Sequence, residues 1–150
     1  MAAVTSVMRA HQLLLARVEA VLRPEGLTFA RYEVLMLLIL SRSGELPLTL
    51  VGSRLQVHPA SVTGLVNRLE RDGLVARTID PRDRRARRLS VTPEGRAAAL
   101  AATERLNAQV FADDWLAGDH GASLVSILTD LRHESGDFNT RGPVAEGRRG

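Results

Sequence analysis

The chain has 150 residues and contains neither cysteine nor lysine, so that all 20 of its basic residues are arginine. The missing cysteine excludes disulfides, thiolate metal sites and thiol redox switches. A GC-rich genome is the simplest explanation for the missing lysine. Arginine is nevertheless the residue best suited to bidentate contacts with phosphate and guanine.

Long apolar runs are also missing from the sequence. No stretch reaches the length of a membrane span, and Met1–Ala20 contains charges and lacks the apolar core of a signal peptide. We therefore expect a cytoplasmic protein without a membrane partner. The length suits one compact domain, and the net charge of +3 is concentrated in one segment rather than spread along the chain.

That segment, His58–Arg96, begins with the pattern of an amphipathic helix. Pro59 suits the first helical position. The spacing i, i+3, i+4, i+7 of one buried face is formed by Val62, Leu65, Val66 and Leu69. Small and polar residues occupy the other side, namely Ala60, Ser61, Thr63, Gly64, Asn67, Arg68 and Arg71. Such side chains bind base edges and phosphates, although a solvated face explains this helix equally well when it is taken alone.

A β-hairpin is predicted directly after this helix. Asp72-Gly73 ends the helix with glycine as a left-handed cap, and Leu74–Ile79 and Leu89–Thr92 have the alternation of two strands. The connection between them contains five arginines, at positions 82, 84, 85, 87 and 88. Because these charges repel one another, we expect an anionic partner such as a phosphate backbone or a narrow minor groove. A merely solvated hairpin is the alternative.

This run of residues resembles the MarR family of bacterial transcription regulators. The resemblance is carried, in this order and spacing, by Ser61–Thr63, Arg68–Glu70, Asp72–Arg77, Asp80–Arg85 and Leu89–Gly95, and more loosely by Leu13–Leu131. It implies a winged helix-turn-helix whose terminal helices form a homodimer. It also implies a response to small, often aromatic or anionic, molecules bound between the dimer base and the winged domain.

Two positions depart from the pattern of the family that the chain resembles. Many relatives carry an acidic residue where this chain has Asn67, and that residue pairs with the wing arginine that matches Arg85. The ion pair cannot form here, which leaves Asp83 as the expected partner of Arg85. Relatives also often have a larger polar residue in place of Gly64, so direct base contact at that position is not implied.

Helical patterns precede the segment. A broad apolar stripe runs along Val4–Leu22, too wide for a helix with nothing to pack against. Thr28 is predicted to cap a helix that ends near Arg42 and is buried because it is apolar nearly all round from Val34 to Leu40. Further predictions are a short strand at Leu46–Leu48, a helix Leu50–Gln56 capped by Thr49, and a turn at Gln56–His58, which together complete a helix-turn-helix.

Two more helices are predicted after the hairpin. Thr92 caps the first and Pro93 starts it, and its apolar side is expected to hold Ala97, Leu100, Ala101, Leu106, Val110 and Phe111. Residues 113–118 interrupt it, and Ala122–Arg132 forms the last helix. The terminal helices carry more apolar surface than a lone winged helix could bury, so we expect a homodimer. Gly136–Gly150 has no periodicity and is predicted to be disordered.

These patterns predict a mainly α fold with a small β-wing (α+β). We expect residues 1–24 to form a dimerisation helix, residues 28–92 a winged helix-turn-helix, residues 93–133 further dimerisation helices and residues 134–150 a disordered tail.

The sequence contains no pattern of a catalytic or metal site. The histidines at positions 11, 58, 120 and 133 fall in different predicted elements, and none has a partner at metal-ligand spacing. The acidic residues near positions 113 and 119 are explained by a polar helix break. GxSxG, P-loop and GxGxxG motifs are missing as well. We therefore expect no enzyme activity, no cofactor and no metal.

The predicted function is that of a homodimeric transcription regulator, a repressor by preference, which binds double-stranded DNA in a sequence-specific manner. Its contacts are expected from the recognition helix, at His58, Ala60, Ser61, Thr63, Gly64, Asn67, Arg68 and Arg71, and from the wing, at Arg82, Asp83, Arg84, Arg85 and Arg87. Arg85 is the candidate for insertion into the minor groove, whereas His58 is better explained as a cap or backbone contact.

Candidate effector residues are His11, Arg31, Tyr32 and Trp115. Each also has a structural explanation: a half-buried histidine, a surface charge, and core filling for the two aromatic residues. Two other functions stay open. A winged-helix module that binds protein would usually lack a basic wing, and a small-molecule-binding or catalytic protein on the same dimer would need a convergent polar set that the sequence does not reveal.

Overall fold

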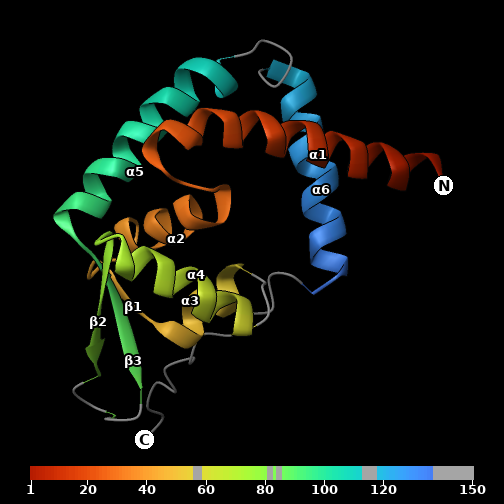
Figure 1. Cartoon of the computed structure of the whole chain (residues 1–150). Coiled ribbons are helices and arrows are strands. Elements are labelled where there is room, and N and C mark those ends of the chain that lie inside the picture. Colours follow the sequence, from red (N-terminus) through yellow and green to blue (C-terminus); the bar gives the residue numbers. More distant parts are fainter. Residues whose placement is uncertain (56–58, 81–82, 84–85, 113–117, 137–150) are drawn as a thin grey trace, which may run out of the picture. The chain divides into compact units, whose positions relative to one another are not determined.

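The computed structural model describes residues 1–55, 59–80, 83, 86–112 and 118–136. The chain divides into two compact units, residues 1–112 and residues 113–150. The predicted class is confirmed, since helices and a small antiparallel sheet make up the fold (Figure 1). Among the described residues, no helix combines the length and apolarity needed to span a bilayer.

The first unit contains most of the elements. In chain order these are α1 (Ala2–Leu22), a 3₁₀ turn (Arg23–Glu25), α2 (Phe29–Ile39), β1 (Glu45–Pro47), α3 (Leu48–Leu55), α4 (Pro59–Arg71), β2 (Val75–Ile79), β3 (Arg87–Val91) and α5 (Pro93–Leu106), which continues as a π-helical turn (Asn107–Phe111). The second unit contains α6 (Gly118–Glu134), which begins four residues before the predicted start at Ala122.

Threonine side chains cap two of the helices as predicted. The Thr28 hydroxyl accepts a hydrogen bond from the backbone N–H of Arg31 at 3.3 Å, and the Thr92 hydroxyl accepts one from Gly95 at 3.0 Å. The same prediction for Thr49 is wrong. Because β1 leads directly into α3 at Leu48, Thr49 lies inside the first turn of that helix rather than before it.

The sheet has the strand order β1-β3-β2, with both pairs antiparallel. Glu45 lies opposite Ser90, and β2 pairs with β3 from Val75 opposite Val91 to Ile79 opposite Arg87. The return strand is therefore longer than predicted, because it begins at Arg87 rather than at Leu89. Two of the five arginines assigned to the loop, Arg87 and Arg88, belong to the strand ladder.

The core lies where α2 meets α1, α4, α5 and the sheet. Its fully buried large side chains include Leu22, Leu35, Leu38, Val66, Leu69, Leu89 and Leu106. The prediction that α2 is buried as far as Leu40 is wrong at its last residue. Leu40 is 76% exposed, because α2 ends at Ile39 and the chain then turns away from the core.

The buried side of α5 differs from the predicted one in its first turns. Leu106 and Val110 are buried as expected, but Ala99 and Ala102 are buried in place of Ala97 and Leu100. Phe111 is also exposed. A run of alanines has no contrast in size or polarity between the faces of a helix, so periodicity could not predict which side of α5 is buried. The buried side is set by a backbone contact at Gly95.

Gly95 lies against the turn that joins α4 to β2. A Cβ atom at this position would lie 1.9 Å from the carbonyl oxygen of Leu74, so no other residue fits without a backbone shift. Thr92 reinforces the contact, since its N–H donates to Leu74 O at 3.1 Å and its hydroxyl donates to Gly73 O at 2.7 Å. The start of α5 is thereby locked to the end of the helix-turn-helix.

We predict that Gly95→Ala destabilises the fold by about 1–3 kcal/mol or more, the usual cost of overpacking a closely packed contact. Gly64→Ala is the matched control. Among the described residues nothing outside the local helix backbone approaches the Cβ position of Gly64 within 4 Å, so alanine should stabilise α4 by about 0.5–1 kcal/mol. Urea unfolding followed by circular dichroism measures both, and equal stability of the two variants would contradict the prediction.

Candidate nucleic-acid interface

The helix α4 is amphipathic as predicted, with one face in the core and the other exposed. Val62, Val66 and Leu69 are buried and Leu65 is partly buried. The predicted contact residues are exposed where the structure describes them, at Ala60, Ser61, Thr63, Gly64, Asn67, Arg68 and Arg71. A Cβ atom at Gly52 of α3 would lie 3.2 Å from Val62, so glycine permits a close approach of the two helices in the helix-turn-helix.

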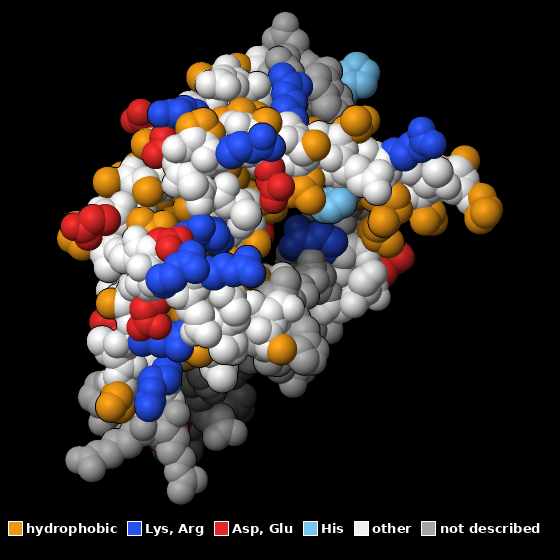
Figure 2. Space-filling view, viewed as in Figure 1, with side chains coloured by type: hydrophobic (Ala, Val, Ile, Leu, Met, Phe, Trp, Pro, Cys, Tyr) orange, Lys and Arg blue, Asp and Glu red, His pale blue; other side chains and the backbone are white. Residues whose placement is uncertain are grey.

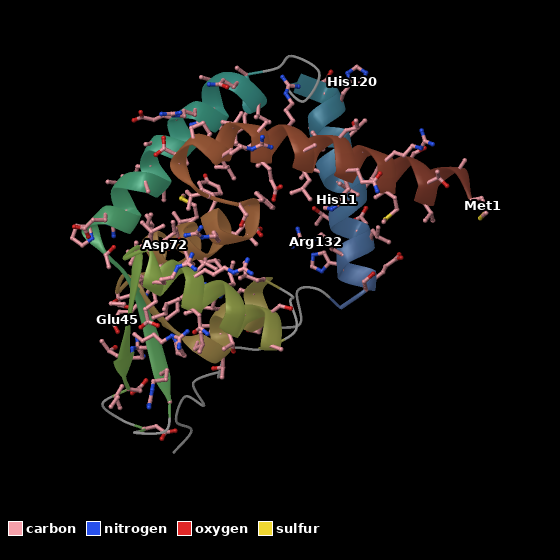
Figure 3. All side chains as sticks on the ribbon, viewed as in Figure 1. Met1, His11, Glu45, Asp72, His120 and Arg132 are labelled. Atoms are coloured by element: carbon pink, nitrogen blue, oxygen red, sulfur yellow. The ribbon has the colours of Figure 1, made fainter. Side chains whose placement is uncertain are left out.

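The C-terminal end of α4 is held by an ion-pair cluster around Asp72. One carboxylate oxygen accepts from Arg31 Nη2 at 2.5 Å, and the other lies 3.0 Å from Arg71 Nε. Arg31 also donates through Nη1 to the carbonyl of Gly26 at 2.8 Å. Because Arg31 lies in the first turn of α2, the cluster joins the end of α4 to α2, beside which Asp72 lies in Figure 3.

Two carboxyl groups in this region have shifted pKa values. Hydrogen bonds from Arg71 and Arg31 lower the pKa of Asp72 below its usual value, with their charges acting in the same direction and desolvation acting against them. On α2, burial raises the pKa of Glu33. Asp72 is thus an anion at neutral pH that keeps the neighbouring guanidinium groups in place.

A second cluster braces the base of the wing. Arg88 on β3 lies 2.7 Å from Glu45 on β1 through Nε and 3.2 Å from Asp80 through Nη1. These hydrogen bonds, first to Glu45 and then to Asp80, raise the pKa of the Arg88 guanidinium. The backbone of the loop closes on itself as well, because Asp80 N donates to Ala86 O at 3.1 Å. Arg88 therefore fixes the direction of the hairpin rather than contacting an external anion.

A third contact joins the wing to the recognition helix. Arg77 on β2 donates through Nη2 to the side-chain oxygen of Asn67, and its Nε lies 3.3 Å from Glu70 Oε2. The second distance is an ion pair without hydrogen-bond geometry, since Arg77 Nε has no hydrogen-bond partner among the described residues. The exposed face of α4 and the first strand of the wing are thus joined through one guanidinium.

Both of the predicted wing contacts that the structure describes are exposed. Asp83 and Arg87 both lie at the surface, and Figure 2 shows arginines with interspersed carboxylates on the side of the first unit that carries α4 and the strands. The other predicted wing contacts, Arg82, Arg84 and Arg85, lie outside the described residues, as does His58. The expected pairing of Arg85 with Asp83 therefore stays a prediction.

Three of the four candidate effector residues, His11, Arg31 and Tyr32, belong to the part of the chain that the structure describes. His11 is exposed on α1, and the Tyr32 hydroxyl lies 2.9 Å from Thr103 Oγ1 on α5, which agrees with a structural role for Tyr32. Arg31 has only 12% of its side chain exposed, since its guanidinium contacts Asp72 and Gly26. Trp115 lies outside the described residues.

Sequence reasoning missed Arg77, Arg88 and Asp72 as residues that position the interface. Asp72 was assigned only to the helix end, and Arg88 was counted with the loop. The pairing of Arg77 with Glu70 could have been predicted, because these opposite charges lie seven residues apart on either side of a predicted helix-strand turn. The partners of Arg88 and Asp72 on β1 and α2 are 43 and 41 residues away, beyond any local pattern.

Comparison with known proteins gives concordant matches. A sequence model of the MarR family matches residues 29–86. The HTH-type transcriptional repressor MdtR of Bacillus subtilis is 38% identical over 71 residues. That alignment covers 47% of this chain and 44% of the repressor, so the chain matches less than half the length of this curated relative.

Two solved proteins match over most of their lengths. Sco5413, a MarR family transcriptional regulator from Streptomyces coelicolor, is 47% identical with a TM-score of 0.84, over 92% of this chain and 96% of that one. CouR from Rhodococcus jostii RHA1, bound to p-coumaroyl-CoA, is 26% identical with a TM-score of 0.72, over 91% of each chain. CouR bound to a 23-mer DNA duplex has a TM-score of 0.78 at the same identity, over 84% of this chain and 89% of that one.

We predict that the Asp72 cluster makes stability depend on pH in the acid range. Since the folded pKa of Asp72 is below its usual value of 3.8, its contribution is complete above that value and is lost as the pH falls through the folded pKa. The difference in melting temperature between wild type and Asp72→Asn should therefore be largest near neutral pH and shrink below about pH 4.

Asp130→Asn is the control for this experiment, because Asp130 is an exposed aspartate on α6. The melting temperature of Asp130→Asn should differ little from that of the wild type over the same pH range. A difference between wild type and Asp72→Asn that stays constant down to acid pH would contradict the assignment of this contribution to the ionised carboxylate.

Proposed function

The chain belongs to the MarR family, and on that premise we propose that it is a homodimeric, sequence-specific DNA-binding transcriptional repressor. The observation that carries the proposal is the exposed polar face of α4, which contacts of Arg31 and Arg77 hold beside an arginine-rich hairpin braced by Arg88. In the proposed complex two α4 helices enter successive major grooves, roughly 34 Å apart. The operator is then an inverted repeat.

The proposed contacts divide between bases and phosphates. Ser61, Thr63, Asn67, Arg68 and Arg71 lie on the exposed side of α4, from which hydrogen bonds to base edges and phosphates are possible. In the wing we assign Arg85 to the minor groove. Phosphate contacts are assigned to three other arginines of the wing, Arg82, Arg84 and Arg87.

The homodimer is proposed from the apolar surface left exposed at the chain ends. The first half of α1 exposes Val4, Val7, Met8 and Leu13, although Val18 and Leu22 in its second half are buried in the core. On α6, Leu124, Val125, Ile127 and Leu131 are exposed. Apolar side chains at this density favour a partner over water, which supports residues 1–24 and 93–133 as the dimerisation segments.

We also propose regulation by a small aromatic or anionic effector, as CouR is bound to p-coumaroyl-CoA. A ligand that favours a dimer with the wrong helix spacing would release DNA by population shift. Of the candidates, Arg31 would have to exchange its contact with Asp72 for an anionic ligand. The proposed location is the cytoplasm, and the proposed activity is regulatory rather than enzymatic.

The first test is a titration of the protein against its own upstream DNA at two salt concentrations, with scrambled competitor. We expect binding that survives competitor and a footprint over an inverted repeat. In this assay Asn67→Ala should weaken the binding free energy by about 1–3 kcal/mol for the operator and by less for scrambled DNA. Arg85→Ala should weaken binding to all DNA and reduce the salt slope by about 1.

Ser53→Ala on α3, an exposed serine outside the proposed contact set, serves as the control and should bind like wild type. A loss for Asn67→Ala that is equal on operator and scrambled DNA would show that the face of α4 is wrongly assigned. Binding by the wild type that vanishes with competitor would favour a protein-binding winged-helix module instead.

We predict that Val7→Glu/Met8→Glu dissociates the dimer, because each change places a charge on the exposed apolar stripe of α1. Analytical ultracentrifugation should give a monomer for this variant and a dimer for wild type. Ser6→Glu adds a single charge at an exposed position outside the side of α1 that holds Val4, Val7 and Met8, and should stay dimeric. A double variant that remains dimeric would remove α1 from the interface.

A further inference from the structure

The contact between Arg77 and Asn67 determines how the recognition helix presents one side chain. Arg77 belongs to β2, where it lies opposite Leu89, and three-quarters of its side chain is buried (25% exposed). Its guanidinium faces two residues, Asn67 and Glu70, that lie three positions apart and therefore on the same side of α4. A partly buried cation from the wing is thus held directly against the exposed helix face.

The chemistry of the two groups allows one orientation of the Asn67 amide. A guanidinium has only donors, whereas an asparagine amide has an acceptor at Oδ1 and two donors at Nδ2. Arg77 therefore selects the orientation in which Oδ1 faces the wing strand. Without Arg77 the amide would be able to rotate by half a turn about its last bond and present either end.

We propose that Arg77 is a positioning residue for sequence recognition, which holds Asn67 so that its Nδ2 donors are presented to an acceptor in the major groove. Suitable acceptors are the N7 and O6 atoms of guanine, N7 of adenine and O4 of thymine. This inference rests on the proposed DNA-binding function. It adds a residue that faces the helix rather than the groove, and assigns a donor role to Asn67.

Glu70 completes the arrangement. Its carboxylate lies 3.3 Å from Arg77 Nε, which favours the guanidinium position and offsets its positive charge next to the helix. Because Arg77 is engaged on two sides, it is a poor candidate for a phosphate contact. Removal of its charge should therefore change base preference more than it changes the salt dependence of binding.

The test compares dissociation constants for the operator and for operators with single base-pair changes at the position where Asn67→Ala loses preference. We expect Arg77→Ala to lose the same preference, by about 5-fold or more, with little change in salt slope. The double variant Arg77→Ala/Asn67→Ala should lose no more preference than either single variant. Arg87→Ala, which removes a charge from the exposed part of β3, should lower affinity and keep the preference.

A second variant keeps the test independent of folding defects. Asn67→Asp retains an acceptor for Arg77 and removes both donors, so it should remain folded and yet lose the same preference. In the free protein, the Asn67 side-chain amide resonances should shift in Arg77→Ala and stay unchanged in Arg87→Ala, as seen by nuclear magnetic resonance.

Three outcomes would overturn the proposal. With specific binding by wild type, retention of base preference by Arg77→Ala would overturn the role of Arg77, and retention by Asn67→Asp would overturn the donor role of Asn67. Asn67 amide resonances that are insensitive to Arg77→Ala would do the same. If scrambled competitor DNA abolishes binding of the wild type to the operator, the proposed function is overturned, and the role of Arg77 in recognition is overturned with it.

Discussion

The backbone contact between Gly95 and Leu74 is the constraint on which the rest of the first unit depends. Three elements meet there: α4 ends at Arg71, β2 begins at Val75 and α5 begins at Pro93. The missing side chain at Gly95 allows the approach, and the hydrogen bonds of Thr92 fix it. The recognition helix, the wing and the long helix α5 thus share one junction, and the direction of each depends on the other two.

The arginines of the helix-turn-helix and wing have two different roles. Arg31, Arg77 and Arg88 have largely buried side chains that contact carboxylates on other elements. Ion pairs so close to the surface add little stability, because water screens them and ordered side chains lose entropy. Their effect is on direction, since each joins two elements. Arg68, Arg71 and Arg87 are exposed at the surface, and Arg71 also pairs with Asp72, so a count of arginines along the sequence overestimates the binding charge.

Local patterns predicted the elements of the site well, because their signals come from residues close in sequence. Periodicity and Pro59 gave the bounds of α4, and Thr28 and Thr92 are caps in the structure. The failures arise where tertiary contacts decide. Alanines gave no reason to prefer one side of α5, and Leu40 is exposed because α2 ends at Ile39 rather than near Arg42 as predicted. The roles of Arg88 and Asp72 depend on partners on distant elements, which a single sequence does not pair.

The first turn of α2 connects the DNA-facing helix to α5 through two adjacent residues. Arg31 contacts Asp72 at the end of α4, and Tyr32 contacts Thr103 on α5. A movement of α4 relative to α5 must therefore break one of these polar contacts or carry α2 with it. A hydrogen bond such as that of Tyr32 contributes about 0.5–1.5 kcal/mol, and coupling between two ligand sites typically amounts to about 1–3 kcal/mol. The two contacts of α2 therefore tie the position of α4 to that of α5, each with an energy of the order that such coupling requires.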